Sequence, residues 1–160
     1  MYRIILIKLI LNSSEAENDA LLTVAKLMVA AARTAPKTRG EDTIHTAIVN
    51  GEDKEKLAAT MDDLGRDRDA GNVRASGAVV LIGVESGKVS EEWWPYQAKL
   101  IDLGIALGSA VKVASDLNID NRIMRSVGIA AMKMGLVEGD DVEGIPLSVK
   151  GKNLYFDRKS

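Results

Sequence analysis

The stretch AVVLIGV, residues 78–84, decides the fold of this chain. All seven residues are apolar or glycine, valine is prominent, and Gly77 and Gly87 bound the run. Seven residues are too few for a typical helix, and β-branched side chains favour strands, so the run predicts a strand covered on both faces. The sequence therefore predicts a sheet with this strand at its centre and helices packed against it.

Seven further segments are expected to form helices or strands around this strand. The first helix begins at the Ser14/Glu17 capping-box pattern and cannot continue past Pro36. The others are a strand at 43–49, helices at 53–70, 100–114 and 122–134, and strands at 142–148 and 153–157. Asp120 or Asn121 is the expected cap of the helix at 122–134. Because no repeat or long linker divides the chain, residues 14–160 are expected to form one α+β domain with a mixed or antiparallel sheet.

The N-terminal run IILIKLIL, residues 4–11, is apolar but is interrupted by Lys8. A membrane span needs about 20 apolar residues, and a signal peptide needs a stronger basic start and a small-residue cleavage site. We therefore expect residues 1–13 to form an N-terminal strand or extension, with a short buried helix as the alternative. The expected protein is cytoplasmic and has no membrane contact.

The composition excludes several classes of function. The chain has 21 basic and 23 acidic residues, and a net charge of −2 provides no basic field for nucleic acid. It has no cysteine, so it cannot form a disulfide, a thiolate nucleophile or a cysteine-ligated iron–sulfur cluster. Glycine-rich nucleotide motifs, the HExxH zinc motif and a nucleophile elbow are also missing from the sequence. The composition alone therefore names no reaction.

The stretch ARTAPKTRGEDT, residues 32–43, contains the first candidate ligand site. Arg33, Lys37 and Arg39 place three cations within seven residues, and Gly40 permits a backbone conformation that points amides toward an anion. A phosphate or a carboxylate would suit this loop. The structural alternative is that the cations complement the dipole at the end of the preceding helix and need no ligand.

Arg122 and Arg125 form the second candidate site. They fall in the first turn of a predicted helix, where positive charge opposes the helix dipole. Either Asp120 and neighbouring carboxylates pair with them, or an anion binds at the helix N-terminus with help from the backbone amides. We expect the two groups of cations to converge on one phosphate-bearing small molecule.

Other polar and small residues have structural interpretations. Gly104 and Gly108 lie one turn apart in a predicted buried helix and favour close approach of a partner helix over a ligand. Asp102 in the same helix requires an arginine or several amides if it is buried. His45 is the sole histidine and has no HxH or HxxxH partner, so its spacing predicts no metal site. The acidic stretch at residues 138–143 is expected to be solvated surface.

Five segments together resemble an uncharacterised prokaryotic family of ferredoxin-domain-containing proteins. They are ARTAPKTRGEDT (32–43), IDLGIALGSAVK (101–112), NIDNRIM (118–124), GIPLS (144–148) and GKNLYFDR (151–158). In that family a ferredoxin-type cysteine run corresponds to residues 83–99 of this chain. These residues contain no cysteine, so no iron–sulfur cluster is expected here.

The layout is also similar to that of flavin-dependent nitroreductases, at Ala35-Pro36, at residues 104–108 and at residues 144–146. This resemblance implies an α+β homodimer with a pocket for flavin mononucleotide (FMN) at the subunit boundary. It also implies Lys37, Arg39 and Arg158 as phosphate ligands, with electron transfer carried out by the cofactor. The alternatives are a non-catalytic homodimeric scaffold module that has lost its redox centre, and a sensor of a nucleotide or small acid.

Overall fold

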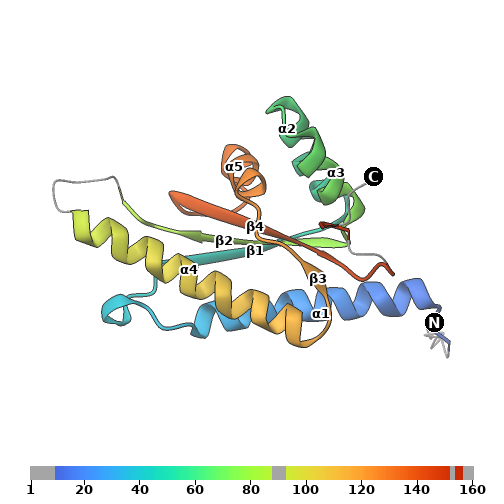
Figure 1. The fold of residues 1–160 in the computed structure, drawn as a ribbon, viewed down its shortest axis with the longest axis horizontal. Helices are drawn as coiled ribbons and strands as arrows, with labels where there is room; N and C mark the ends of the chain where they lie inside the picture. Colours follow the sequence, from blue (N-terminus) through green and yellow to red (C-terminus); the bar gives the residue numbers. More distant parts are fainter. Residues whose placement is uncertain (1–9, 88–92, 152–153, 157–160) are drawn as a thin grey trace, which may run out of the picture.

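A four-stranded antiparallel sheet lies between two layers of helices in the computed structural model, which describes residues 10–87, 93–151 and 154–156 (Figure 1). The strands are β1 (Ile44–Val49), β2 (Ala78–Val84), β3 (Asp120–Asn121) and β4 (Asp141–Ser148), in the spatial order β1-β2-β4-β3. One face of the sheet carries the helices α1 (Ser13–Thr34) and α4 (Trp93–Asp116). The other face carries α2 (Gly51–Asp63), α3 (Asp67–Ala75) and α5 (Arg125–Met134). The predicted α+β fold is confirmed.

Strand β2 is the centre of the sheet, as its sequence predicts. All of its residues are buried, and it pairs antiparallel with β1 on one side and with β4 on the other. Val80 and Ile82 belong to the core formed with α1 and α4, whereas Val79 and Leu81 belong to the core on the α2 and α5 side. The alternation of side chains along one strand therefore supports two hydrophobic cores.

Helix α1 begins with a capping box, but at a different position from the predicted one. The Asn12 side chain accepts from the Glu15 amide at 2.9 Å, and the Glu15 carboxylate accepts from the Asn12 amide at 3.2 Å. The predicted box at Ser14 and Glu17 was wrong, because Asn12 starts the helix earlier. The helix ends before Pro36, as predicted.

The helix predicted at residues 53–70 is two helices, α2 and α3. The helical conformation is interrupted at Gly65, whose φ of 69° lies in the left-handed region that favours glycine. The strand predicted at residues 153–157 is also wrong where the structure describes it, because Leu154–Phe156 form a turn. Asp120 and Asn121 lie in β3 and do not cap α5, whose N-cap is Met124.

Glycines allow α5 to lie directly on β4. A Cβ atom at Gly128 would be 1.8 Å from the Val142 carbonyl oxygen, and one at Gly144 would be 2.2 Å from Cγ1 of Val127. Side chains at these two positions would push the helix away from the strand. The contact fixes where the N-terminus of α5 lies, which positions the candidate site below.

Most of the predicted N-terminal strand, residues 1–9, lies outside the described residues. Ile10, Leu11 and Asn12 precede α1 without regular secondary structure. Among the helices in the described ranges, none combines the length and the apolar character that crossing a bilayer requires.

Candidate functional site

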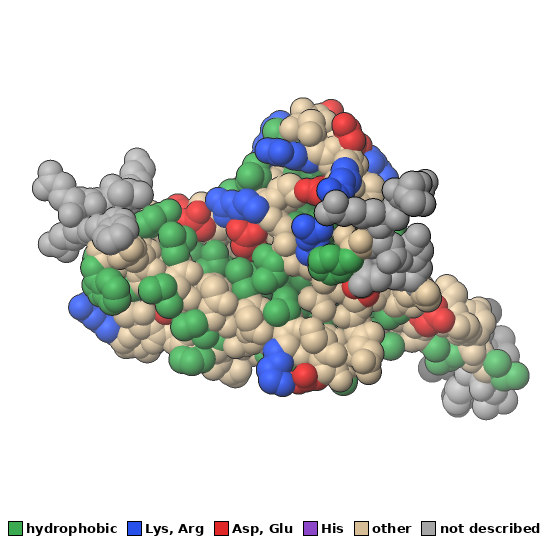
Figure 2. All heavy atoms as spheres, in the orientation of Figure 1, with side chains coloured by type: hydrophobic (Ala, Val, Ile, Leu, Met, Phe, Trp, Pro, Cys, Tyr) green, Lys and Arg blue, Asp and Glu red, His purple; other side chains and the backbone are tan. Residues whose placement is uncertain are grey.

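A pocket of about 300 Å³ opens at the N-terminal end of α5. It has both charged and apolar walls, and they come from three parts of the chain: the α2–α3 connection, the start of α3, and the segment from residue 122 into α5. The lining residues are Arg66, Asp69, Arg122, Ile123, Met124, Arg125, Ser126 and Ile129. Figure 2 shows basic and acidic side chains next to each other in the region of α5 and β4. We call this the α5 pocket.

The first residues of α5 line the pocket, and no side chain caps this end of the helix. Met124 is the N-cap and makes no capping hydrogen bond through its side chain. The amides of the first helical residues have no acceptor within the helix, and the helix dipole adds partial positive charge there. The Ser126 hydroxyl donates to the Asp69 carboxylate at 2.5 Å, which links α5 to α3. The helix N-terminus is therefore suited to an anion.

Arg125 is paired within the protein, as one of the two predicted alternatives requires. Its guanidinium lies 3.2 Å from Asp141 Oδ1 and 3.3 Å from Glu143 Oε1, and it donates to the Val142 carbonyl at 3.0 Å. Burial raises the pKa of Glu143 above its ordinary value, although Arg125 acts in the opposite direction. The charge of Arg125 is therefore largely balanced by β4.

Arg122 and Arg66 differ from Arg125, because within the described residues neither has a carboxylate partner. Arg122 precedes α5, donates to the Tyr155 carbonyl at 3.3 Å, and lies over the Phe156 ring at 5.2 Å. Arg66 is exposed between α2 and α3. The α5 pocket thus has two guanidinium groups whose charge is available to a ligand.

The cations of the loop after α1, residues 33–40, mostly bind the protein itself. Arg33 donates to Asp42 at 2.6 Å and to the Ile44 carbonyl at 2.7 Å. The Lys37 side chain is only 6% exposed and donates to the carbonyls of Ala32 and Arg33 at the end of α1. Burial raises the pKa of Asp42, but the hydrogen bond from Arg33 and other contacts bring it below its ordinary value. The alternative of a cation at the helix end describes Lys37, whereas Arg33 pairs with Asp42 and with the start of β1.

The tip of this loop is a 3-10 turn, η1 (Thr38–Gly40), that is attached to α4. Arg39 is exposed with a φ of 57°, and Gly40 has a φ of 71°. The Asp102 Oδ1 atom accepts from the Thr38 amide at 2.8 Å and from the Thr38 hydroxyl at 2.9 Å. Asp102 is 1% exposed. One amide and one hydroxyl thus take the place of the predicted arginine or set of amides.

The chain by itself does not bring the two groups of cations to one ligand. The loop after α1 lies with α4 on one face of the sheet, whereas α5 lies on the other (Figure 1). Arg158, the third phosphate ligand that the resemblance implies, lies outside the described residues. Arg122 and Arg125 are predicted from the sequence, but Arg66 is not, because a continuous helix was expected across residues 53–70. The adjacent Gly65 was the available signal.

Residues 96–158 match a family model described as an uncharacterized protein containing a ferredoxin domain (DUF2148). An uncharacterized protein from Archaeoglobus fulgidus is 41% identical over 180 aligned positions, which cover 94% of this chain and 98% of the relative. The chain belongs to the DUF2148 family. The predicted family membership is confirmed. This DUF2148 protein nevertheless contains no cysteine to ligate an iron–sulfur cluster.

Solved nitroreductases share the fold of this DUF2148 protein. A putative nitroreductase from Desulfovibrio desulfuricans, in complex with FMN, has a TM-score of 0.63 at 14% identity and covers 86% of this chain and 79% of its own. The FMN-dependent nitroreductase NfnB from Mycobacterium smegmatis, in complex with NADPH, has a TM-score of 0.63 at 11% identity. The match covers 86% of this chain and 82% of NfnB. The predicted nitroreductase-like architecture is confirmed.

The hypothetical oxidoreductase YcnD from Bacillus subtilis also matches, with a TM-score of 0.60 at 12% identity over 82% of this chain. The DUF2148 protein spans only about three fifths of the length of several such structures, 58% in the case of YcnD. At these identities the likeness shows the fold alone.

Proposed function

We propose that this DUF2148 protein binds FMN in the α5 pocket and acts as a redox-type protein through that cofactor. The observation that carries the proposal is the pair Arg66 and Arg122, which line the pocket and have no carboxylate partner in the described part of the chain. The Asp69 carboxylate, which also lines the pocket, accepts a hydrogen bond from Ser126. The fold neighbours that contain FMN or depend on it add support. Another phosphate-bearing ligand would use the same charges.

The walls of the α5 pocket fit the two parts of FMN. Ile123 is 41% exposed and Ile129 is 38% exposed, so apolar surface is available to a flat ring. The guanidinium groups of Arg66 and Arg122 and the first amides of α5 suit the phosphate. The flavin ring would supply electron transfer, and the protein side chains would bind and orient it.

We further propose that the protein is a homodimer in which α4 packs against a second copy. Trp94, Ile101 and Ile105 are 60%, 52% and 39% exposed, and their spacing places them on one side of the helix together with Gly108. Figure 2 shows apolar side chains following α4. Glycine on such a stripe permits close helix contact. The exposed stripe, rather than burial on every side, explains the apolar character of this helix.

The experiment is a fluorescence titration of FMN and of riboflavin, which lacks the phosphate. Removing two charge-assisted contacts with Arg66→Gln and Arg122→Gln together should weaken FMN binding by about 100-fold and riboflavin binding far less. Arg39→Gln is the matched control, because Arg39 lies on the other face of the sheet, and it should change neither affinity. A purified protein that is colourless and does not bind FMN would refute the proposal.

A scaffold function is the second candidate, and one observation favours it. Arg33, Lys37 and Arg125 already pair with Asp42, Asp141 and Glu143 or with backbone carbonyls. A dimer that assembles normally and binds neither FMN nor inorganic phosphate would support this function over the flavin proposal.

A further inference from the structure

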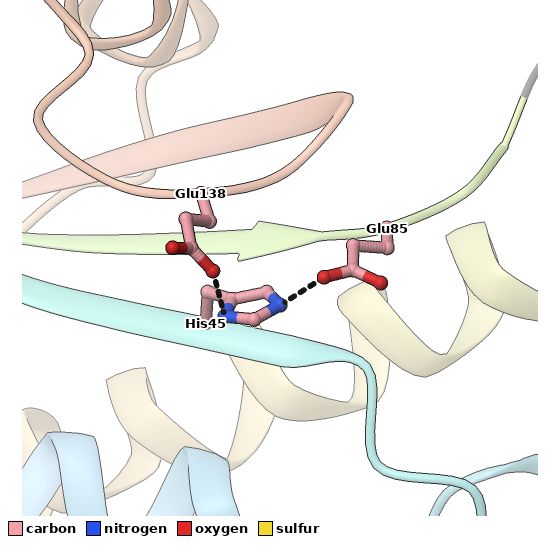
Figure 3. A group of neighbouring side chains, drawn as sticks. All are labelled: His45, Glu85 and Glu138. Atoms are coloured by element: carbon pink, nitrogen blue, oxygen red, sulfur yellow. Dashed lines mark hydrogen bonds and ion pairs between the residues drawn. The ribbon is translucent and has the colours of Figure 1, made fainter.

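Three side chains with metal-binding groups meet at one end of the sheet (Figure 3). His45 comes from β1, Glu85 follows β2, and Glu138 precedes β4. The Nε2 atom of His45 lies 2.8 Å from Glu85 Oε1, and its Nδ1 atom lies 3.3 Å from Glu138 Oε2. One ligand atom from each residue lies within 4.8 Å of the others. Three segments that are distant in sequence thus present an imidazole and two carboxylates together.

The register of the β1–β2 ladder places His45 next to Glu85. His45 is paired with Gly83, and the Glu85 amide donates to the Thr43 carbonyl at 3.1 Å, which extends the ladder beyond β2. Residues 83 and 85 point to the same face of the sheet, because side chains alternate along a strand. Glu85 is therefore the diagonal neighbour of His45, within reach of a long side chain.

Two glycines allow the turn that carries Glu138 to lie against β2. A Cβ atom at Gly83 would be 2.4 Å from the Glu138 carbonyl oxygen, and one at Gly139 would be 2.9 Å from the Val84 amide nitrogen. The Asp140 amide donates to the Val84 carbonyl at 2.9 Å and fixes the turn. The position of the Glu138 backbone above the strand is thus determined by these contacts, which places its carboxylate within reach of His45.

The charge around His45 favours a bound cation. Glu85 and Glu138 are exposed, and within residues 10–87, 93–151 and 154–156 their ion-pair partner is His45 rather than a lysine or an arginine. Asp140, on the same turn, adds a further negative charge. With a neutral imidazole, Glu85 and Glu138 have no positive partner in the described part of the chain, and a metal ion would supply it.

We propose that His45, Glu85 and Glu138 form a binding site for a divalent transition-metal ion such as Zn²⁺ or Co²⁺. Imidazole nitrogen together with carboxylate oxygen selects these ions over Mg²⁺ and Ca²⁺, which take oxygen ligands. Donors around a tetrahedral Zn²⁺ with bonds of about 2.0–2.1 Å lie roughly 3.3 Å apart. One ring nitrogen of His45 and one oxygen of each carboxylate already lie within 4.8 Å of one another, so side-chain rotation would bring these three atoms around one ion. Water completes the coordination, since the carboxylates are exposed. The site uses none of the residues that line the α5 pocket, so it does not depend on the flavin proposal.

The test uses the untagged chain, because an affinity tag of histidines would bind the same ions. Isothermal titration with Zn²⁺ should show one saturable site per chain, and Co²⁺ should give visible absorption bands on binding. His45→Gln should weaken Zn²⁺ binding by at least about 100-fold, and Glu138→Gln by about 10-fold or more.

Glu138→Gln keeps the test decisive, because this side chain is 81% exposed and its replacement leaves the fold intact. The matched control is Asp63→Asn, which removes an exposed carboxylate at the end of α2 and should leave Zn²⁺ binding unchanged. His45 is the sole histidine, so its ring protons give a single set of NMR signals that Co²⁺ should shift or broaden. A lack of saturable binding, or equal binding by wild type and His45→Gln, would show that the three residues form only an ion-paired cluster and would overturn the proposal.

Discussion

The loop after α1 and the N-terminal end of α5 carry the same kind of side chain and use it differently. At the C-terminal end of α1, Lys37 is nearly buried and binds the last carbonyls of the helix. At the N-terminal end of α5, Arg66 and Arg122 line a pocket together with the first residues of the helix and have no carboxylate partner in the described ranges. A cation satisfies a helix C-terminus by itself, but beside a helix N-terminus it leaves positive charge for a ligand. Whether a cluster of cations lies at the C-terminal or the N-terminal end of a helix thus decides whether it stabilises the fold or binds a ligand.

The largest expected effect is that of Gly128→Ala, which disturbs the packing of α5 on β4 and therefore the N-terminal end of α5. The new Cβ atom would be placed 1.8 Å from the Val142 carbonyl oxygen, where neither backbone can easily move. We expect a loss of about 3 kcal/mol or more in the free energy of unfolding, measured by urea denaturation, and loss of FMN binding. Gly71→Ala in α3 is the control, because its Cβ meets no described atom within 4 Å. In that variant the free energy of unfolding should rise by up to about 1 kcal/mol, because alanine favours the helix more than glycine does. A Gly128→Ala protein as stable as wild type would contradict the docking of α5 on β4.

The next effect concerns the anchor of the loop after α1. Asp102→Leu leaves the Thr38 amide and hydroxyl without their acceptor and should lower the free energy of unfolding by about 1–3 kcal/mol. Asp102→Asn keeps an acceptor oxygen and should cost less. Both variants should bind FMN like wild type, because the loop and the α5 pocket lie on opposite faces of the sheet. An FMN affinity that falls in Asp102→Asn would connect the two regions.

A smaller effect separates cations that stabilise from cations that bind. Lys37→Met removes hydrogen bonds to the last carbonyls of α1 and should lower the free energy of unfolding by about 1 kcal/mol. Arg66→Gln should change it by no more than about 0.5 kcal/mol, because Arg66 is exposed and unpaired in the part of the chain that the structure describes. Thermal unfolding of the two variants measures the difference. The opposite order of stabilities would invalidate the comparison.

The smallest effect is on the pH dependence of stability, where the two regions have opposite signs. The pKa of Asp42 is lowered from 3.8, so its stabilising contribution is present above that value and is lost as the pH falls through the folded-state pKa. The pKa of Glu143 is raised from 4.5, so stability decreases as the pH rises from 4.5 through the raised pKa. Each contribution should stay below about 1 kcal/mol, since solvent screens Asp42 and the charge of Arg125 opposes the effect of burial on Glu143.

Melting temperatures of Asp42→Asn and Glu143→Gln between about pH 3 and about pH 7 test these signs. Asp42→Asn should reduce the loss of stability on acidification. Glu143→Gln should remove the decline in stability that wild type shows as the pH rises above 4.5. For each variant, the difference in melting temperature from wild type is followed against pH. If these two differences changed with pH in the same direction, the assignment would be contradicted.

The sequence was most informative where burial is complete. Strand β2 has the predicted bounds, because a strand buried on both faces produces an unbroken apolar run that few other structures produce. The break between α2 and α3 was missed, because the charged pattern continues across Gly65 and the exposed faces of the two helices look alike in sequence. The capping box shifted from Ser14 to Asn12, because both residues can cap and only the backbone conformation decides.

The sites were predicted only in part, because long-range contacts define them. Arg122 and Arg125 are visible as cations at a helix start, but Arg66 reaches the same pocket only after α3 packs near α5. The spacing of His45 predicted no metal site, since Glu85 and Glu138 are distant in sequence and come close through the ladder register and the turn at Gly139. Motif searches find ligands on one element, whereas this group of ligands is spread over three.

The pairing of β2 with β4 also has a consequence for folding. β4 is the last strand of the described chain, and α4 and α5 lie between it and β2. During synthesis, β2 therefore remains open along one edge until the C-terminal part emerges, and its fully apolar sequence is the kind that self-associates into cross-β aggregates. Nascent chains that stall before β4 should depend on chaperones far more than full-length chains.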